Sequence, residues 1–569
     1  MSDNHDSVPP ELQPTQPEPD AAAEPAAPLR KPRRTAIIAA VAGAAALLLI
    51  VGGGAWAFTT LVLGKGQSAA ASAAAFPKST VGWAEFAIDP SNDQKLAALD
   101  FTNNLPGLED ALAATGIDLD LSGGADTDLK KTAWKAFVSA LGESKTSLDY
   151  DNDIKPWLGS RVAVGLLPNN GSNESQIMIA IESSDDSAAK KSLTTLLAEQ
   201  DDAAGWTVGA HGGYALLGSE GVDLNEVFRT GLLEDNPEFA SAASKSGDWG
   251  LVSGWTGPGF AAEVSRVSSS DGTSADSALA AVQGGSQFAV VRIVDGALEL
   301  SGTSTGIESG PELGDAGSAV SSLPASTMLA GSAGSLGVML DYILSDNDLG
   351  AVAAEAYGSA LGADPAASSE EQIAAARATV TDFFSTSFGL TFPEDVDSLF
   401  GESLTVVLDG NVSLDTLSTS TDPYADIIGS GLAVVVTSTD AEATGKQWDT
   451  VLGTATEQLG ADLGLTATVA SDRVVIGAGS YAEVLAGPAG NLGTSEQGAL
   501  VLPDLDGASG VFYLDIPAAL ATIEDISNTF GGTAADTAAL EGLGAIGATS
   551  TRVSDTESSY RIRLSTISK

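Results

Sequence analysis

The sequence predicts an α+β fold, in which a disordered N-terminal tail and one transmembrane helix precede two related halves of antiparallel sheet packed with helices. Three observations lead to this prediction. An uncharged apolar stretch lies near the N-terminus, short segments of the region behind it recur later in the same order, and patterns typical of strands alternate with patterns typical of helices. A chain of 569 residues also exceeds what one hydrophobic core usually serves, so two or more folded units are expected.

The apolar stretch from Thr35 to Leu63 contains no charged residue. A bilayer core of about 30 Å needs about 20 apolar helical residues, and the part from Ile37 to Ala57 supplies that length. We therefore expect a transmembrane helix within residues 35–63. Basic residues concentrate in front of this stretch, which places the N-terminus in the cytoplasm and the remainder of the chain outside. These topology residues are Arg30, Lys31, Arg33 and Arg34.

A cleaved signal peptide is the alternative interpretation of this stretch. Such a peptide has a short apolar region of about 7–15 residues behind a compact basic start. Here the apolar stretch is longer, and a long leader precedes it. The run from Ala71 to Ala73 resembles a cleavage site, but a retained membrane anchor explains the segment better.

Two segments flank the predicted anchor. Residues 1–34 form a tail in which the part from Val8 to Pro28 is rich in Pro, Glu, Gln and Ala, so it has little to bury and should be disordered in the cytoplasm. Residues 64–75 are rich in Gly, Ser and Ala, which is typical of a linker between a membrane and a folded domain.

The region behind the linker contains an internal duplication. Five short segments recur in the same order, at distances that drift only as small insertions in loops would make them drift. We therefore expect two extracytoplasmic α+β repeats, at 76–315 and 318–569. The paired segments begin at Phe76 and Leu323, Asp153 and Asp395, Ile177 and Leu432, Tyr214 and Arg473, and Trp249 and Ser509.

Each half offers the same kinds of element. The β-branched run from Ile177 to Ile181 predicts a buried strand, and Asp185 behind it is suited to begin a helix because a carboxylate can accept free N–H groups. Asp440 has the same place in the second half. Asp295-Gly296, between two strand-like runs, predicts a hairpin turn.

Several of these residues resemble a family of single-pass, membrane-anchored extracytoplasmic domains of unknown function from high-GC Gram-positive bacteria. Phe76-Pro77 with Thr80, Asp89-Pro90 followed by Gln94 to Leu99, and Lys155-Pro156-Trp157-Leu158-Gly159 carry the resemblance. The family has no established activity and no assigned catalytic residues, so the resemblance implies membrane attachment and a bacterial envelope, and no site residue.

The composition excludes several kinds of chemistry. The formal net charge is -49, with 75 acidic and 26 basic residues, and a surface this negative repels nucleic acid. The chain has no cysteine, which removes disulfides, thiolate metal sites and cysteine nucleophiles. Of its two histidines, His5 lies in the tail and His211 lies in a glycine-rich turn without a serine nucleophile motif.

One acidic segment has the spacing of metal ligands. Asp149, Asp151 and Asp153 alternate as in the first part of an EF-hand loop, which makes them candidate calcium ligands. Ile154 stands where that loop needs Gly, and Ser160 stands where it needs a bidentate Glu. The alternative is an acidic loop that is only exposed to solvent and binds no metal ion. The sequence indicates no other cofactor.

The sequence therefore favours a non-catalytic binding or scaffold module of the cell envelope, held to the lipid bilayer by one helix. Its partner would be an envelope protein, a polymer or a ligand that the sequence does not identify. The alternatives are an envelope hydrolase that uses carboxylates alone and a calcium-responsive, adhesin-like module.

Overall fold

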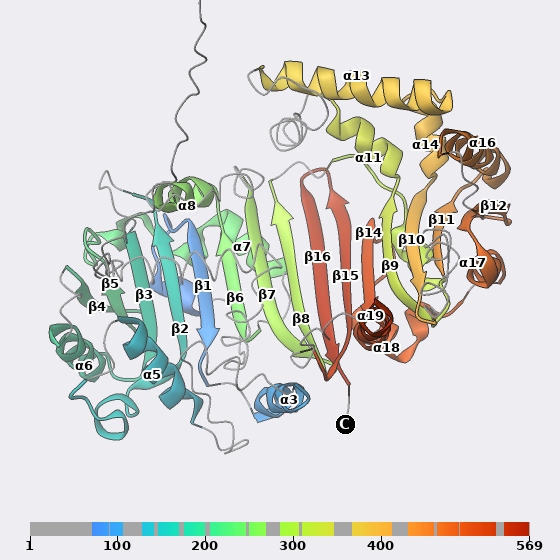
Figure 1. The fold of residues 1–569 in the computed structure, drawn as a ribbon. Helices are drawn as coiled ribbons and strands as arrows, with labels where there is room; N and C mark the ends of the chain where they lie inside the picture. Colours follow the sequence, from blue (N-terminus) through green and yellow to red (C-terminus); the bar gives the residue numbers. More distant parts are fainter. Residues whose placement is uncertain are drawn as a thin grey trace, which may run out of the picture.

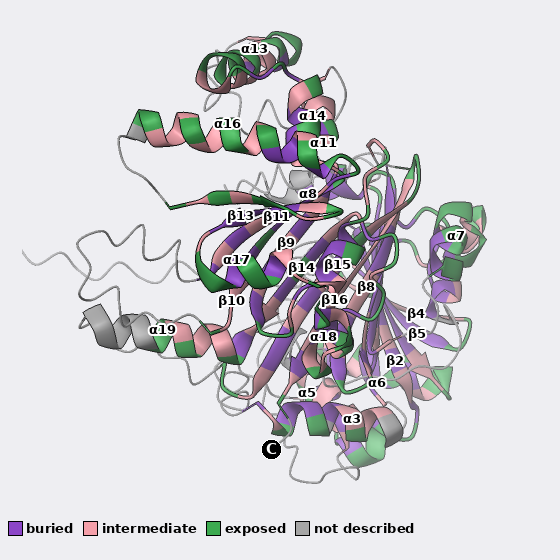
Figure 2. Cartoon of the chain, turned by 90° about the vertical axis from the view of Figure 1, so that its right-hand side faces the viewer, coloured by how far each residue is buried: buried purple, intermediate pink, exposed green. Residues whose placement is uncertain are grey.

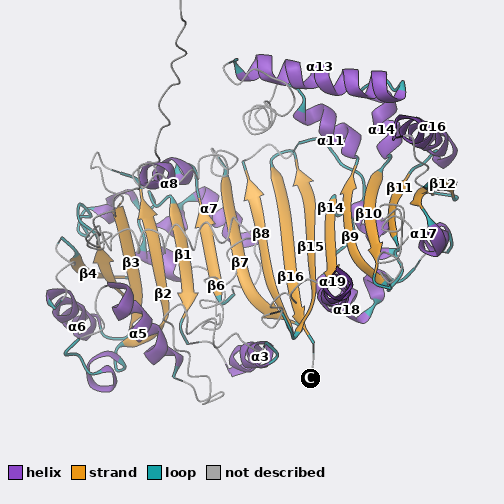
Figure 3. Cartoon of the chain, in the orientation of Figure 1, coloured by secondary structure: helices purple, strands orange, loops and turns teal. Residues whose placement is uncertain are grey.

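The computed structural model describes fourteen stretches of the chain, which together form one open, twisted sheet with helices on both faces (Figures 1 and 3). All strand pairings are antiparallel. The described residues are 71–89, 92–105, 128–141, 146–169, 176–199, 205–245, 250–268, 285–306, 310–345, 367–411, 431–459, 464–488, 490–530 and 540–567.

In the described part of the chain, sixteen strands make up the sheet, and the first eight along the chain occupy one half of it. From the outer edge inward these are β4 (Thr207–His211), β5 (Tyr214–Gly218), β3 (Gln176–Ser183), β2 (Leu158–Leu167), β1 (Gly82–Ala87), β6 (Val252–Thr256), β7 (Ser286–Val294) and β8 (Ala297–Thr305). The sheet then continues with β16 (Glu557–Thr566), β15 (Leu543–Ser554), β14 (Gly510–Asp515), β9 (Thr327–Gly334), β10 (Ser403–Asp409), β11 (Leu432–Thr437), β13 (Arg473–Gly477) and β12 (Thr466–Val469).

The predicted fold class gave each half an antiparallel sheet of its own, and this prediction is wrong, because the described strands form one sheet. The last strand of the first half, β8, pairs with the last strand of the second half, β16, over eight consecutive residue pairs. One continuous sheet therefore replaces two, and the hydrogen-bonding edges that two separate sheets would expose at this place are paired with each other.

A buried carboxylate stabilises the junction between the halves. The Glu299 side chain on β8 is fully buried, and its Oε2 accepts a hydrogen bond of 2.7 Å from Nε of Arg563 on β16. Its Oε1 accepts one of 2.8 Å from Nε of Arg292 on β7. Burial raises the pKa of Glu299, but the hydrogen bonds from the two guanidinium groups outweigh it and hold the pKa below the usual value.

The two halves share one strand order. If the strands of each half are numbered 1 to 8 along the chain, their order from the outer edge of the sheet to its middle is 4-5-3-2-1-6-7-8 in both halves. Segments that recur in the sequence lie on equivalent strands: Ile177 to Ile181 on β3 and Leu432 to Val436 on β11, and Tyr214–Gly218 as β5 and Arg473–Gly477 as β13.

Helices cover both faces of the first half. On one face, Leu193 and Leu196 pack against Ile179 and Ile181 of β3, and on the other face Phe239 packs against Trp83 with ring centroids 5.3 Å apart. The first face carries α3 (Asn92–Asn103), α5 (Leu129–Leu141), η3 (Tyr150–Ile154), α6 (Asp186–Ala198) and α8 (Phe260–Ser268), and the second carries η1 (Ala71–Ala75), η5 (Val227–Thr230), η6 (Leu233–Asp235) and α7 (Pro237–Lys245).

In the second half, one face is covered closely and the other partly (Figure 2). Helices α11, α13 and α14 gather with α16 at the end of the sheet that carries β10 to β12 (Figure 1). The helices of this half are α10 (Ala316–Ser321), α11 (Leu336–Ile343), α13 (Ser369–Phe388), α14 (Glu394–Phe400), α16 (Ala441–Leu459), α17 (Gly479–Ala486), η7 (Leu492–Thr494), α18 (Glu496–Val501) and α19 (Ile516–Phe530).

Local signals in the sequence placed several elements correctly. Asp185 caps α6, since its Oδ1 accepts hydrogen bonds from the backbone N–H groups of Ser187 and Ala188. Asp295-Gly296 forms the turn between β7 and β8. Residues 71–75, the end of the predicted linker, form the 3-10 helix η1, in which Ala73 and Ala75 are fully buried.

The predicted tail at 1–34 and transmembrane helix at 35–63 lie outside the described residues. Among the residues that are described, no helix is both long enough and apolar enough to cross a membrane.

Candidate functional site

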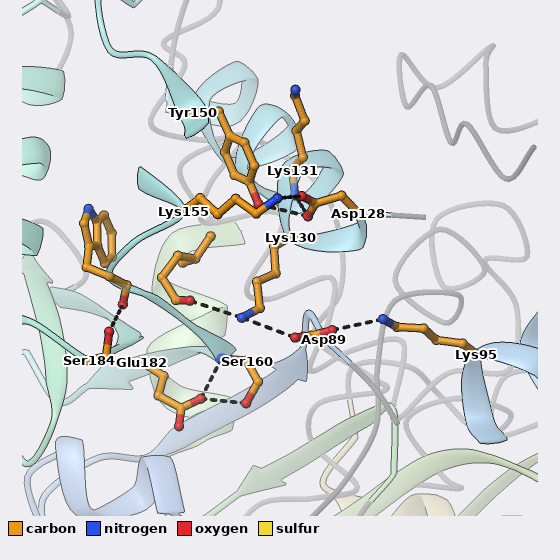
Figure 4. A network of polar contacts seen from close by, with 12 residues as sticks. Asp89, Lys95, Asp128, Lys130, Lys131, Tyr150, Lys155, Ser160, Glu182 and Ser184 are labelled. Carbon is orange, nitrogen blue, oxygen red and sulfur yellow. Dashed lines mark hydrogen bonds and ion pairs between the residues drawn. The ribbon is translucent and has the colours of Figure 1, made fainter. Parts of the chain in front are cut away.

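A cluster of charged side chains, which includes the candidate ligand Asp151, lies where α5, η3 and the start of β2 meet (Figure 4). The cluster draws four lysines from three separate segments, although the chain has only 26 basic residues. We call it the lysine–carboxylate network, and it consists of Asp89, Lys95, Asp128, Lys130, Lys131, Tyr150, Asp151 and Lys155.

Asp128 is the centre of one part of this network. Its Oδ2 lies 2.8 Å from Nζ of Lys155, and its Oδ1 accepts a hydrogen bond of 3.0 Å from the Tyr150 hydroxyl (Figure 4). Burial acts to raise the pKa of Asp128, but the hydrogen bonds from Lys155 and Tyr150 hold it below the usual value. Burial and the Asp128 carboxylate raise the pKa of the Tyr150 hydroxyl, so this phenol stays protonated and cannot serve as a base near neutral pH.

Two ammonium groups also lie near the aromatic ring of Tyr150. Nζ of Lys131 is 5.4 Å from the centroid of the Tyr150 ring, and Nζ of Lys155 is 5.9 Å from it. Both distances are within the range of cation–π attraction. The side chain of Tyr150 thus holds α5 and η3 together through its ring and its hydroxyl.

Asp89 is the centre of the other part. It follows β1, and its two oxygens lie 3.0 Å from Nζ of Lys95 on α3 and 3.2 Å from Nζ of Lys130 on α5 (Figure 4). Lys130 donates in addition to the Leu158 carbonyl at 3.2 Å. These contacts tie α3 and α5 to the end of β1.

The three candidate calcium ligands are not brought together as a ligand set. Asp149 caps η3, with Oδ1 accepting the backbone N–H of Asn152 at 2.9 Å. Asp153 Oδ2 accepts the backbone N–H of Asp149 at 2.9 Å. Asp151 lies 3.7 Å from Nζ of Lys131, whose charge competes with a cation. In the described part of the chain, no group of three His, Cys, Asp or Glu side chains could hold a metal ion, and calcium binding stays a prediction.

The segment 155–159, which carries part of the family resemblance, is explained by packing. The Trp157 ring is buried and its Nε1 donates to the Asp153 carbonyl at 2.7 Å. Gly159 is required because a Cβ there would lie 2.8 Å from the Glu182 carbonyl oxygen. Glu182 in turn accepts hydrogen bonds of 2.8 Å from the backbone N–H and the hydroxyl of Ser160 (Figure 4).

A second charged group is buried inside the sheet, and the sequence reasoning missed it. Arg161 on β2 donates to Glu85 on β1 at 2.8 Å, and both side chains are less than a tenth exposed. Burial raises the pKa of Glu85, and the charge of Arg161 offsets part of that rise. An isolated Glu within the apolar-looking run of β1 was the only signal in the sequence, and its partner lies 76 residues away.

The remaining predicted residues are placed as follows. His211 ends β4, and its ring stacks on Phe228 with centroids 4.2 Å apart. The topology residues Arg30, Lys31, Arg33 and Arg34 lie outside the described residues. Lys95 and Lys155 lie in segments that carry the family resemblance, but no ion pair was predicted for them. Lys130 and Lys131 were missed, although two lysines at the start of an amphipathic helix are a usable signal in so acidic a chain.

Comparisons with known proteins give one match. A family model described as a protein of unknown function (DUF3352) matches residues 40–208, which include the lysine–carboxylate network, Arg161 and Glu85. A domain of unknown function was expected from the resemblance, and within these residues it is confirmed; the expected membrane attachment and bacterial origin stay predictions. No curated protein and no solved structure matches the chain.

Proposed function

We propose that the folded part of this chain is a non-catalytic binding platform of the cell envelope, on which one long sheet presents surfaces to partners outside the cytoplasm. The location is supported by the basic residues and the uncharged stretch of the first 63 residues. The absence of a catalytic role is supported by how the described titratable groups are used.

One observation carries the proposal. Catalysis needs acids and bases whose pKa values are shifted at a place that a substrate can reach. Among the described residues, the carboxyl groups with shifted pKa values lie in ion pairs or accept hydrogen bonds, with the exception of Asp397, which lies on α14 against α11. The network's ammonium groups are likewise paired with carboxylates of the same network.

The segments that carry the family resemblance support the same proposal. Lys155 pairs with Asp128, Trp157 fills the core, and Gly159 permits the approach of β3. Each residue has a role in holding the sheet and α5 together. A fold-stabilising role for these residues is what a scaffold requires, since the function of a fold lies in the sites placed on it.

An envelope hydrolase is the competing function, and one carboxylate pair would have to serve it. Burial and the nearby Asp341 carboxylate raise the pKa of Asp397, as in an acid–base pair. However, Asp341 Oδ1 lies 2.6 Å from Nη2 of Arg377, so one member of the pair is held in a salt bridge. This engagement favours the platform over the hydrolase.

Proximity labelling in living cells tests the proposal. A labelling enzyme fused to the C-terminus of the full chain should mark a small, reproducible set of envelope components. The matched control is the same enzyme fused behind residues 1–75, which lack the sheet and should not mark that set. Equal labelling by both fusions contradicts the proposal.

A second measurement separates the platform from the hydrolase. The purified chain should release no soluble fragments from isolated cell walls. Release that disappears in an Asp341→Asn, Asp397→Asn double variant would establish the hydrolase and overturn the platform.

A further inference from the structure

A cavity of about 490 Å³ lies against the outermost strand of the first half. Four consecutive residues of β4 line it, and the loop that follows β5 forms the opposite wall. The cavity therefore runs along the edge of the sheet. Its lining residues are Lys190, Thr207, Val208, Gly209, Ala210, Gly221, Val222, Asp223, Leu224 and Asn225.

The hairpin of β4 and β5 determines which backbone groups face the cavity side of the edge. His211 and Tyr214 flank a two-residue turn, Gly212-Gly213, with φ values of 61° and 82°. In such a hairpin the flanking pair is hydrogen-bonded, and hydrogen-bonded pairs then alternate along the ladder. Val208 and Ala210 fall at the other positions, so their N–H and C=O groups point away from β5.

These outward groups are unused within the described chain. β4 is the last strand of the sheet at this end (Figure 3), and no backbone hydrogen bond joins Val208 or Ala210 to another described segment outside the sheet. An unpaired strand edge offers a row of donors and acceptors with the spacing of another strand.

The cavity also has one positively charged side chain that could pair with a ligand. Lys190 on α6 is the one cationic side chain among the lining residues, and it makes no ion pair with any described residue. The other charged lining residue, Asp223, is engaged in its own turn, because Oδ1 accepts the backbone N–H of Asn225 at 2.9 Å and its Nδ2 at 3.3 Å. An incoming carboxylate can therefore pair with the Lys190 ammonium group, while Asp223 keeps its negative charge in the same lining.

We propose that the edge of β4 and Lys190 form a binding site for an extended peptide segment of a partner protein, which adds a strand to the sheet and places an acidic side chain on Lys190. This inference rests on the proposed platform function and names its class of partner. Backbone hydrogen bonds to Val208 and Ala210 supply affinity that does not depend on sequence, and Lys190 supplies selectivity. A segment of about five residues, some 17 Å long, matches β4.

The occupant that the cavity favours is a single peptide strand and not the sheet edge of a second copy. The loop wall at 221–225 and Lys190 of α6 border the edge on two sides. The cavity that they line has a volume of about 490 Å³. The equivalent outer strand of the second half, β12, provides a matched edge for comparison.

A random peptide library displayed on phage and panned against the full chain tests the site. Enriched peptides, made synthetically with a fluorescent label, should share an acidic residue and bind the chain in anisotropy titrations. Ala210→Pro removes the outward N–H group at a position where an edge strand tolerates proline, and it should weaken binding about tenfold or more. The control is Ala467→Pro on β12, which should leave binding unchanged.

Charge reversal provides a test that does not depend on the backbone variant. Lys190→Glu should weaken the acidic peptides about tenfold, and replacing their shared acidic residue by Lys should restore binding to this variant. Binding to Ala210→Pro or Lys190→Glu within about twofold of the wild type, or enriched peptides without a shared acidic residue, would overturn the site. A chain that dimerises through this edge, seen as Ala210→Pro-sensitive sedimentation, would overturn the peptide as occupant.

Different results would exclude the binding platform and the peptide site at β4. If both variants retain the proximity-labelling pattern of the wild type, the platform stands and the β4 site is excluded. If the labelling pattern is no different from that of residues 1–75 while the peptides bind as described, the platform fails and the peptide site remains.

Discussion

Residues 155–159 and 397–401 occupy equivalent places in the two halves, immediately before or at the start of β2 and β10. Both segments end in a glycine that packs against the neighbouring strand. A Cβ on Gly159 would meet Glu182 of β3, and a Cβ on Gly401 would meet the Thr437 carbonyl of β11. The backbone constraint has thus been retained in both halves.

The charges of the two segments differ. Lys155 pairs with Asp128, and this hydrogen bond raises the pKa of the ammonium group, so it stays charged. Asp397 lies at the equivalent position beside Asp341 and Glu394, where burial and two negative charges raise its pKa. The strand geometry therefore requires glycine and buried apolar side chains in both segments, whereas the first residue of the segment carries opposite charges in the two halves.

We expect the largest loss in the free energy of unfolding when a buried aromatic side chain is removed, and a much smaller loss for an exposed one. Trp157→Ala should lower the free energy of unfolding by about 3–5 kcal/mol, because the ring is 1% exposed and leaves a cavity. Phe383→Ala on α13 is the control, since that ring is 53% exposed, and it should cost well under half as much. Urea unfolding curves measure both, and equal losses would contradict the assignment of Trp157 to the core.

A second prediction concerns the two equivalent glycines. Gly401→Ala should lower the free energy of unfolding by about 1–3 kcal/mol, since φ is 63° and the new Cβ also meets a rigid carbonyl. Gly159→Ala should cost less, because Gly159 is not among the glycines with a positive φ, so the new Cβ adds a close contact with Glu182 but no backbone strain. Thermal unfolding midpoints of the two variants measure this ranking, and a larger loss for Gly159→Ala would contradict the stronger backbone constraint at Gly401.

The charged residues should give smaller effects of opposite sign. Asp397→Asn should raise the free energy of unfolding at pH 7 by a few tenths of a kcal/mol, because it removes a carboxylate from beside two others. Asp128→Asn should lower it by up to about 1 kcal/mol, because Lys155 and Tyr150 lose a charged acceptor. A loss of stability in both variants would show that Asp397 makes a favourable contact in the native state.

The smallest predicted effect is the pH dependence of these two carboxyl groups. The pKa of Asp397 is raised above 3.8, so its contribution to stability is present below that value and is lost as the pH rises through the folded-state pKa. The pKa of Asp128 is lowered, so its contribution is present above 3.8 and is lost as the pH falls through the folded-state pKa. Unfolding free energies of the wild type relative to each Asn variant, from pH 7 to pH 3, should change in opposite directions.

The sequence indicated part of the region around the candidate site, but not the contacts within it. Asp149, Asp151, Asp153 and the segment 155–159 stand out by spacing and composition. The same spacing suggested calcium ligands, yet two of these carboxylates hold backbone N–H groups of η3 and the third faces lysines. A carboxylate of this segment could bind a cation or form an ion pair with a lysine. The fold decides between the two, because it brings Lys131 and Lys155 close to Asp151.

The sequence by itself determined the local elements. Asp185 begins a helix, Asp295-Gly296 makes a turn, and the β-branched run at Ile177 to Ile181 makes a buried strand, since each of these depends on a few neighbouring residues. The recurrence of segments in order also pointed to two halves with related elements.

Only the tertiary structure decided how the halves are joined. The pairing of β8 with β16 unites residues about 250 positions apart, and no local pattern records a partner at such a separation. The same applies to Glu299 with Arg563, to Glu85 with Arg161, and to the place of β4 at one end of the described sheet. Sequence patterns determine which face of a strand is buried, whereas the strand that lies beside it follows from the packing of the whole chain.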